Sequence, residues 1–138
     1  MILHAFTDGA SRGNPGESGI GLLVRTETGD PVLAEHGYIG TATNNIAEYS
    51  ALVALLKRAR RWKCTRLVVH SDSELMVRQI NGQYRVKDEV LRGFHAQVTK
   101  LLAGVSFPVE ILHVSRGENR EADRLANLGI DTRKRIRM

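Results

Sequence analysis

The 138-residue sequence has little cysteine and no long hydrophobic segment. Its single cysteine, Cys64, cannot form an intramolecular disulfide and has no second cysteine with which to hold zinc. A disulfide-stabilised secreted domain is therefore excluded, and a reducing compartment suits the chain. No apolar run approaches the roughly 20 residues of a membrane span, and the apolar start at residues 1–6 is too short for a signal peptide. We expect one soluble domain that is cytoplasmic, monomeric and without membrane contact.

The charge balance of the chain is basic. Lysine and arginine exceed aspartate and glutamate by 20 to 15, which gives a formal net charge of +5. A positive balance suits a polyanionic partner such as nucleic acid, although many basic proteins bind none. Charge therefore nominates a partner class without identifying it.

The hydrophobic pattern changes its period halfway along the chain. Short extended runs near the beginning, the first of them apolar on both faces, indicate strands, and from residue 45 a spacing of three to four residues predicts helices. The predicted strands are residues 2–8, 20–26, 32–39, 65–71 and 109–114, and the predicted helices are residues 45–61, 73–80, 90–102 and 119–128, with Gly129 as the last C-cap. A glycine-rich stretch, residues 9–19, separates the first two strands.

This element order predicts an α/β fold. Three consecutive strands form an antiparallel meander, and strand–helix–strand connections then add parallel strands. The expected architecture is a five-stranded mixed sheet flanked by helices. We expect residues 1–130 to form one domain and residues 131–138 to form a basic C-terminal tail.

Two acidic residues follow strands that we expect to be parallel neighbours. Asp8 ends the first strand, and Asp72 follows the fourth. The carboxyl ends of parallel strands meet at one edge of a sheet, where sites gather. The alternative is that each aspartate merely caps the loop or helix that follows.

Two further acidic residues lie near the beginnings of helices. Glu48 heads a row with Leu52 and Leu55, on a face that should point to the core. A capping box with Asn45 would explain its position in the first turn, but not its place on the apolar row. Asp123 lies near the start of the last helix, where interaction with the helix dipole is the simpler explanation.

Together these four carboxylates would repel one another if no cation balanced them. An all-oxygen set suits a hard divalent ion such as Mg²⁺ or Mn²⁺. Two such ions, about 4 Å apart, could activate water for an in-line displacement at phosphorus. An acidic site and a basic exterior are then compatible with one substrate.

Four segments of the chain, in order and spacing, resemble type 1 ribonuclease H over residues 2–130. They are Asp8–Gly16, Thr43–Glu48, Ser71–Ser73 and Asn119–Asp123. The resemblance implies the ribonuclease H-like fold. It also implies that Asp8, Glu48, Asp72 and Asp123 are catalytic metal ligands, which hold two Mg²⁺ or Mn²⁺ ions when substrate is bound.

The resemblance further implies the reaction. A ribonuclease H cleaves the RNA strand of an RNA/DNA hybrid and leaves 5′-phosphate and 3′-hydroxyl ends. The substrate-binding positions that it implies are Asn14, Thr43, Asn44 and Asn45. Contacts to minor-groove 2′-hydroxyls make duplex RNA a second candidate substrate. Glycines at 9, 13 and 16 would let the backbone approach nucleic acid closely.

The chain departs from the pattern of many family members in two places. It lacks their long loop with a histidine before the last aspartate, and Arg116 stands seven residues before Asp123. Arg116 could stabilise phosphate charge or could be an exposed loop residue. His113 lies within a predicted strand, so we favour packing over catalysis. The basic helical extension of some relatives is also missing.

Two alternatives to this enzyme remain. One is a non-catalytic hybrid-binding module of the same fold, and the other is a different nuclease on that fold. A pure binder gains nothing from four carboxylates that repel phosphate in the absence of metal, so their presence favours the enzyme.

Two clusters of basic residues can be explained without a role in substrate binding. The first cluster comprises Lys57, Arg58, Arg60, Arg61, Lys63 and Arg66. We favour the interpretation that it is a solvated helix face whose charges balance the helix dipole. The second, residues 133–137, either touches nucleic acid or is disordered.

Overall fold

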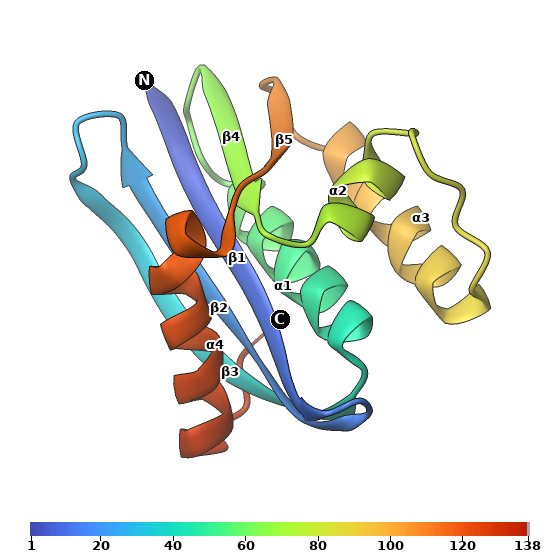
Figure 1. Ribbon diagram of the computed structural model, residues 1–138. Coiled ribbons are helices and arrows are strands. Elements are labelled where there is room, and N and C mark those ends of the chain that lie inside the picture. Colours follow the sequence, from blue (N-terminus) through green and yellow to red (C-terminus); the bar gives the residue numbers. More distant parts are fainter. Residues whose placement is uncertain (138) are drawn as a thin grey trace.

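The protein has a central five-stranded sheet with helices on both faces (Figure 1). The structure is a computed structural model that describes residues 1–137. Its elements are β1 (Ile2–Gly13), β2 (Gly16–Thr26), β3 (Pro31–Ala42), α1 (Asn44–Ala59), β4 (Arg66–Ser71), α2 (Glu74–Ile80), α3 (Glu89–Ala103), β5 (Val109–His113), the 3₁₀ turn η1 (Arg116–Asn119) and α4 (Arg120–Thr132). The predicted α/β class is confirmed.

The strand order in the sheet is β3-β2-β1-β4-β5. The pairs β1–β2 and β2–β3 are antiparallel, whereas β1–β4 and β4–β5 are parallel. The expected mixed sheet is therefore present, with β1 at its centre. This order places the carboxyl end of β4 beside the middle of β1, which continues past their last shared pair.

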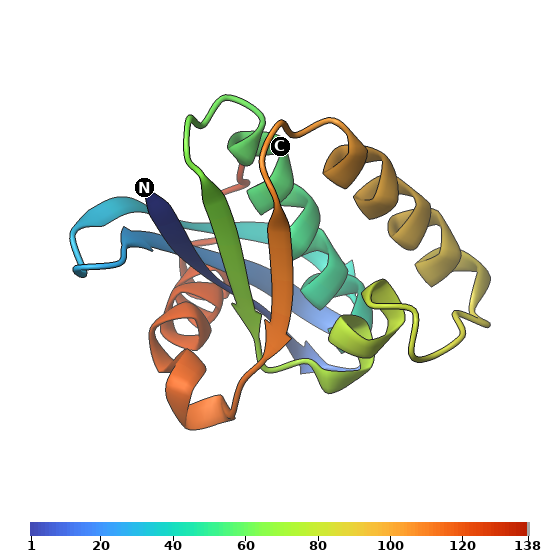
Figure 2. The same ribbon diagram turned by 90° about the horizontal axis from the view of Figure 1, so that it is seen from above.

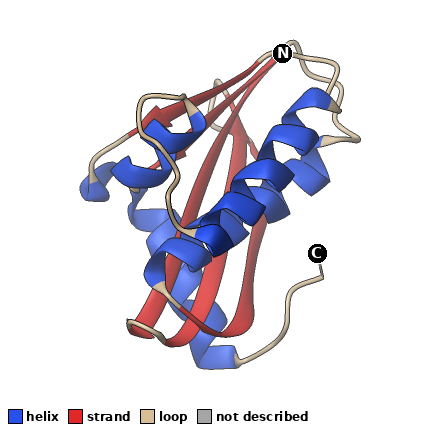
Figure 3. Ribbon diagram, turned by 90° about the vertical axis from the view of Figure 1, so that its right-hand side faces the viewer, coloured by secondary structure: helices blue, strands red, loops and turns tan. Residues whose placement is uncertain are grey.

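Helices cover the two faces unequally. Helices α1, α2 and α3 lie on one face and α4 lies on the other (Figures 2 and 3). The face under α1 holds the main core, because Leu52, Leu55 and Leu56 of α1 are fully buried together with Ile20 and Leu22 of β2. Truncation of one such leucine to alanine typically costs about 2 to 5 kcal/mol.

The first hairpin is longer than the sequence predicted. β1 continues through the glycine-rich stretch to Gly13, and β2 begins at Gly16. The two strands stay paired from Leu3–Thr26 to Gly13–Gly16. Residues 9–12 and 16–19 are thus strand, because continuous ladder hydrogen bonds outweigh the low strand propensity of glycine.

The predicted C-cap at Gly129 is wrong. α4 runs to Thr132, and Arg133 adopts the left-handed conformation that ends it, with φ of 52°. Gly129 lies inside the helix because α4 packs closely on β3. A Cβ at this position would come within 2.4 Å of the Gly37 carbonyl oxygen.

The C-terminal segment packs against the edge strand β3. Tyr38 pairs with Arg135 in a parallel bridge, and its N–H donates to the Lys134 carbonyl over 2.9 Å. Ile136 lies against Gly37, and Arg133 forms an ion pair with Glu17 at 2.7 Å. Residues 133–137 are therefore ordered on the sheet edge. Met138 lies outside the described residues.

None of the helices within residues 1–137 has the length and apolar character needed to cross a membrane.

Candidate active site

The site lies where β4 stops pairing with β1. The last parallel pair joins Thr7 to Ser71. Asp8 and Asp72 are the next residues of the two segments, so both lie just beyond the end of the β1–β4 pairing. Asp72 follows β4, whereas Asp8 lies within β1, which stays paired with β2. The predicted convergence of Asp8 and Asp72 is present, but Asp8 lies within β1 and does not end that strand as the sequence predicted.

Glu48 reaches this rim from α1. Thr43 caps the helix, and its hydroxyl accepts the Ile46 N–H over 3.2 Å. The alternative, a capping box with Asn45, is wrong, because Asn45 lies within the first turn of α1. The Glu48 carboxylate instead accepts the Gly9 N–H over 2.8 Å.

Glycine at position 9 allows α1 to lie this close to β1. A Cβ on Gly9 would come within 2.2 Å of the Ala47 backbone, so any larger residue would push the helix away. Gly9 therefore serves the approach of α1, a different role from the contact with nucleic acid that the sequence analysis assigned to it. Gly13 and Gly16 lie at the exposed hairpin end.

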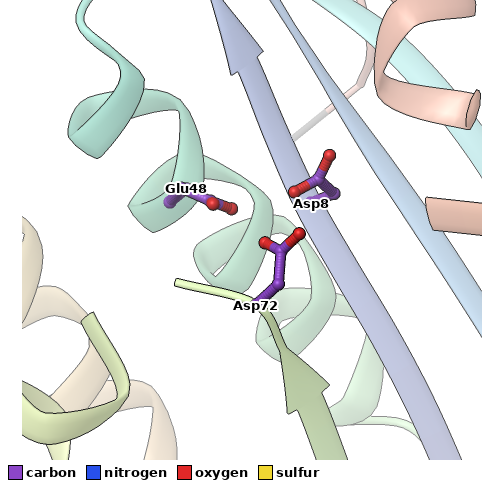
Figure 4. A group of neighbouring side chains, drawn as sticks. All are labelled: Asp8, Glu48 and Asp72. Carbon is purple, nitrogen blue, oxygen red and sulfur yellow. The ribbon is translucent and has the colours of Figure 1, made fainter. Parts of the chain in front are cut away.

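Three carboxylates form one compact cluster. Asp8, Glu48 and Asp72 each offer an oxygen, and these oxygens all lie within 4.8 Å of one another (Figure 4). Asp8 and Glu48 are buried, with 4% and 5% of their surface exposed. None of the salt bridges among residues 1–137 includes any of the three.

Burial and mutual repulsion make the charged form of this cluster unfavourable. Burial, followed by the charges of Glu48 and Asp72, raises the pKa of Asp8 from 3.8 to about 10. Burial and the charge of Asp72 raise the pKa of Glu48 from 4.5 to about 8. The hydrogen bond from Gly9 and the charge of Arg116 act in the opposite direction on Glu48.

This arrangement fits a divalent metal ion. Closely spaced carboxylate oxygens are the donors that Mg²⁺ and Mn²⁺ prefer, and a bound cation would restore the charged forms that burial disfavours. A cluster with no cationic side chain of its own would otherwise be a net cost to folding.

Asp123 approaches the cluster from the opposite face of the sheet. Asp123 is exposed and is the fourth residue of α4. The contact between its carboxyl and that of Asp8 also raises the pKa of Asp8. Gly21, which pairs with Asp8, permits this approach, because a Cβ there would come within 2.3 Å of the Ala122 carbonyl. Asp123 lies outside the compact group of three.

Asn119 holds α4 in place, and the sequence analysis did not single it out. Its side chain is 1% exposed, and its Nδ2 donates to the Thr7 carbonyl over 2.8 Å. The bond ties the beginning of α4 to the residue before Asp8. An asparagine just before a helix reads as an ordinary cap, so the sequence carries no signal for this longer-range contact.

Arg116 and His113 flank the site differently. Arg116 begins η1 and is exposed, and its positive charge lowers the pKa of Glu48. His113 is exposed at the end of β5, so it does not pack beside the sheet as expected.

The four predicted substrate-binding residues gather at the hairpin end beside α1. The Oδ1 of Asn14 accepts the Asn44 N–H over 3.0 Å, which joins the β1–β2 turn to the first turn of α1. Asn14, Asn44 and Asn45 are exposed, and Thr43 is half-buried because its hydroxyl caps the helix. The structure thus brings all four to one surface near the carboxylates.

Comparison with known proteins places almost the whole chain in one family. The family described as "Reverse transcriptase-like" matches residues 6–129. "Ribonuclease HI" of Halobacterium salinarum is 39% identical over 94% of this chain, and the chain spans 64% of that relative's length. It spans only 34% of the matching mycobacterial proteins. "Ribonuclease H" of Coxiella burnetii is 34% identical, with 94% of this chain and 90% of that protein covered.

The solved structures agree with the sequences. The crystal structure of LC11-RNase H1 in complex with an RNA/DNA hybrid superimposes with a TM-score of 0.89 at 35% identity, covering 94% of this chain and 97% of the other. The fold and more than one third of the residues are thus shared over almost the entire length. By sequence and by fold, this chain is a member of the ribonuclease H family.

Proposed function

We propose that this protein hydrolyses the RNA strand of RNA/DNA hybrids in the presence of a divalent metal ion. The observation that carries the proposal is the cluster of Asp8, Glu48 and Asp72, in which the first two are buried and none forms an ion pair within residues 1–137. Its relatives' names support the reaction, and the hybrid bound to LC11-RNase H1 supports the substrate.

Four carboxylates would hold Mg²⁺ or Mn²⁺ in this proposal. Asp8, Glu48 and Asp72 provide the compact set, and Asp123 adds a ligand from α4. Bound ions would lower the pKa of a water and would offset negative charge at the scissile phosphate. The other three carboxylates each raise the pKa of Asp8, so Asp8 would be the central ligand of the set.

The chain's own hydrogen bonds keep these ligands in position. Gly9 orients the Glu48 carboxylate, and Asn119 fixes the start of α4 against β1. Arg116 carries an exposed positive charge next to the cluster, where it can balance charge on the phosphate that reacts.

The exposed asparagines next to the cluster suit the minor groove of the substrate. Asn14, Asn44 and Asn45 offer amide donors and acceptors, and the bond between Asn14 and Asn44 holds two of them in a fixed relation. Such groups can read the 2′-hydroxyls of RNA. Hydrolysis of duplex RNA, the two-ion requirement, activity confined to residues 1–130, a monomeric state and a cytoplasmic location remain predictions from the sequence.

A direct assay tests the proposal. End-labelled RNA/DNA hybrid, duplex RNA and duplex DNA are each incubated with Mg²⁺, Mn²⁺ or EDTA, and the products are sized on a gel. We expect internal cleavage of the RNA strand of the hybrid with either metal ion and no cleavage in EDTA. Ligation that succeeds before but not after phosphatase treatment identifies the 5′-phosphate ends.

Two other outcomes would change the assignment. Tight hybrid binding without cleavage under every metal condition would indicate the non-catalytic binding module. Cleavage of duplex DNA in preference to the hybrid would indicate a different nuclease on the same fold.

A further inference from the structure

A pocket lies at the end of α1 that is remote from the carboxylates. Its volume is about 770 Å³, within the range of about 300 to 1,000 Å³ found for small-molecule sites. Arg60 follows Glu48 by twelve residues, which is roughly 18 Å along the helix. The pocket is lined by Leu33, Glu35, Lys57, Arg58, Arg60, Arg61, Trp62 and Arg137, from the end of α1, the edge strand β3 and the C-terminal segment.

One of the five basic residues of the pocket already has hydrogen-bond and ion-pair partners within the protein. Arg58 forms an ion pair with Glu35 and donates to the Ala54 carbonyl over 2.8 Å and to the Arg137 carbonyl over 2.6 Å. It therefore satisfies the end of α1, as the sequence analysis expected for this cluster. Its bond to Glu35 also consumes the only acidic group of the lining.

The other four basic residues have no such partners. Within residues 1–137, the side chains of Lys57, Arg60, Arg61 and Arg137 form no hydrogen bond or ion pair with the rest of the protein. Four positive charges around one hollow repel each other, to an extent that solvent and salt reduce. An anion bound in the pocket would attract all four side chains and offset their mutual repulsion.

The floor of the pocket adds apolar and aromatic surface. Trp62 and Leu33 both line it, and both are half-buried against the core. The indole N–H of Trp62 makes no hydrogen bond within residues 1–137, so a donor also remains available. A planar ring beside several cations is a combination that favours a ligand with both a flat aromatic group and negative charge.

We propose that this pocket binds a nucleoside polyphosphate, with the base against Trp62 and the phosphates between Arg60, Arg61 and Lys57. Guanidinium groups favour phosphate because their planar N–H donors match pairs of phosphate oxygens. The volume suits one small ligand better than a duplex, which needs an extended surface. This site is separate from the carboxylate cluster and does not depend on the proposed hydrolysis.

Trp62 provides a direct probe, because it is the only tryptophan of the chain. The full-length protein in EDTA is titrated with ADP, and tryptophan fluorescence excited at 295 nm is followed together with calorimetry. We expect saturable quenching with a Kd below about 1 mM. Pyrophosphate should bind about fivefold more weakly because it has no base, and adenosine should not bind measurably.

Matched variants separate the pocket from net charge. Arg60→Gln with Arg61→Gln should weaken ADP binding at least about tenfold, because charge-assisted bonds to phosphate are lost. Lys87→Gln with Lys100→Gln removes the same charge from exposed positions elsewhere and should leave the Kd unchanged. Asp72→Asn should also leave it unchanged, since that residue belongs to the other site.

Three results would overturn the proposal. The first is the absence of saturable binding up to about 10 mM ADP in calorimetry. The second is an equal loss of affinity in both double variants, which would reduce the effect to net charge. The third is displacement of ADP by an equal concentration of a tetraglutamate peptide, which would show that the pocket is an acidic-peptide site.

Discussion

The two ends of α1 gather charges of opposite sign in opposite environments. Glu48, near its beginning, lies in a buried cluster with Asp8 and Asp72. Lys57 and Arg60, near its end, line an open pocket where Arg60 is exposed and Lys57 half-buried. Both ends concentrate like charges, but only the acidic end does so away from water.

Burial decides how much such a concentration costs. At the acidic end, loss of solvation makes each charge costly and repulsion strong, and the pKa values of Asp8 and Glu48 rise accordingly. At the basic end, solvent and counterions screen the repulsion. A buried cluster of like charges is therefore enough to indicate a bound counterion. An exposed cluster indicates a bound ligand only when a shaped pocket and further contacts accompany it.

The most severe test of the acidic end is Asp72→Asn. The substitution removes one charged ligand without changing the shape of the side chain, so we expect turnover on hybrid to fall by at least about a thousandfold. Hybrid binding in EDTA, measured by fluorescence anisotropy, should survive. Asp30→Asn, in the exposed turn between β2 and β3, is the matched control. Unchanged turnover in Asp72→Asn would refute the assignment of the metal ligands.

The stability of the metal-free protein tests the cost of burial. Folding raises the pKa of Asp8 and of Glu48 from 3.8 and 4.5 to about 10 and about 8. Between these limits the folded state binds more protons than the unfolded chain, so stability is greatest near pH 4 and falls as the pH rises towards 8. Denaturant unfolding in EDTA across this pH range should show the decline, and Mg²⁺ should reduce it.

Asp8→Asn should remove part of that cost. Within residues 1–137 the Asp8 side chain accepts no hydrogen bond from a backbone N–H, so its replacement removes an acidic group that burial disfavours without breaking a bond to the backbone. We expect a gain of about 1 to 2 kcal/mol at pH 8 in EDTA, or a rise in Tm of about 5 °C. The gain should vanish at pH 4. A destabilised variant at pH 8 would show that Asp8 is already balanced within the folded protein.

Much of the acidic end could be predicted from the sequence. Asp8 ends one apolar run and Asp72 follows another, and the parallel connection between the two predicted strands already brings these ends together. Glu48 was recognisable because a charged residue on the apolar face of α1 is unusual and indicates a functional role. These features depend on local pattern and chain topology, which sequence periodicity records well.

Contacts between distant segments could not be predicted in the same way. The Asn119 bond to Thr7, the close approach of α4 at Gly129 and the packing of Ile136 on Gly37 each join residues far apart in the chain. Nothing in the local pattern distinguishes these residues from an ordinary cap or an exposed tail. The pocket at the basic end has the same origin, since three separate segments form its walls.

Arg116→Ala tests the one positive charge that acts on the acidic end. Its charge lowers the pKa of Glu48 across an exposed position, where screening limits its strength. We expect kcat on hybrid to fall about fivefold, which corresponds to about 1 kcal/mol, with the Mg²⁺ dependence unchanged. Arg120→Ala, an exposed arginine at the beginning of α4, is the control. A wild-type kcat would remove Arg116 from the site.

The smallest effect is expected at the basic end. In Arg60→Gln with Arg61→Gln, two exposed charges without partners are removed, so the free energy of unfolding should change by less than about 0.5 kcal/mol. Urea unfolding at low and high salt measures this change. At low salt any shift should be a gain in stability, because repulsion with Lys57 and Arg137 falls, and at 1 M salt it should disappear. A loss above about 1 kcal/mol would show that these arginines make structural contacts, and the two ends of α1 would then differ less than their environments indicate.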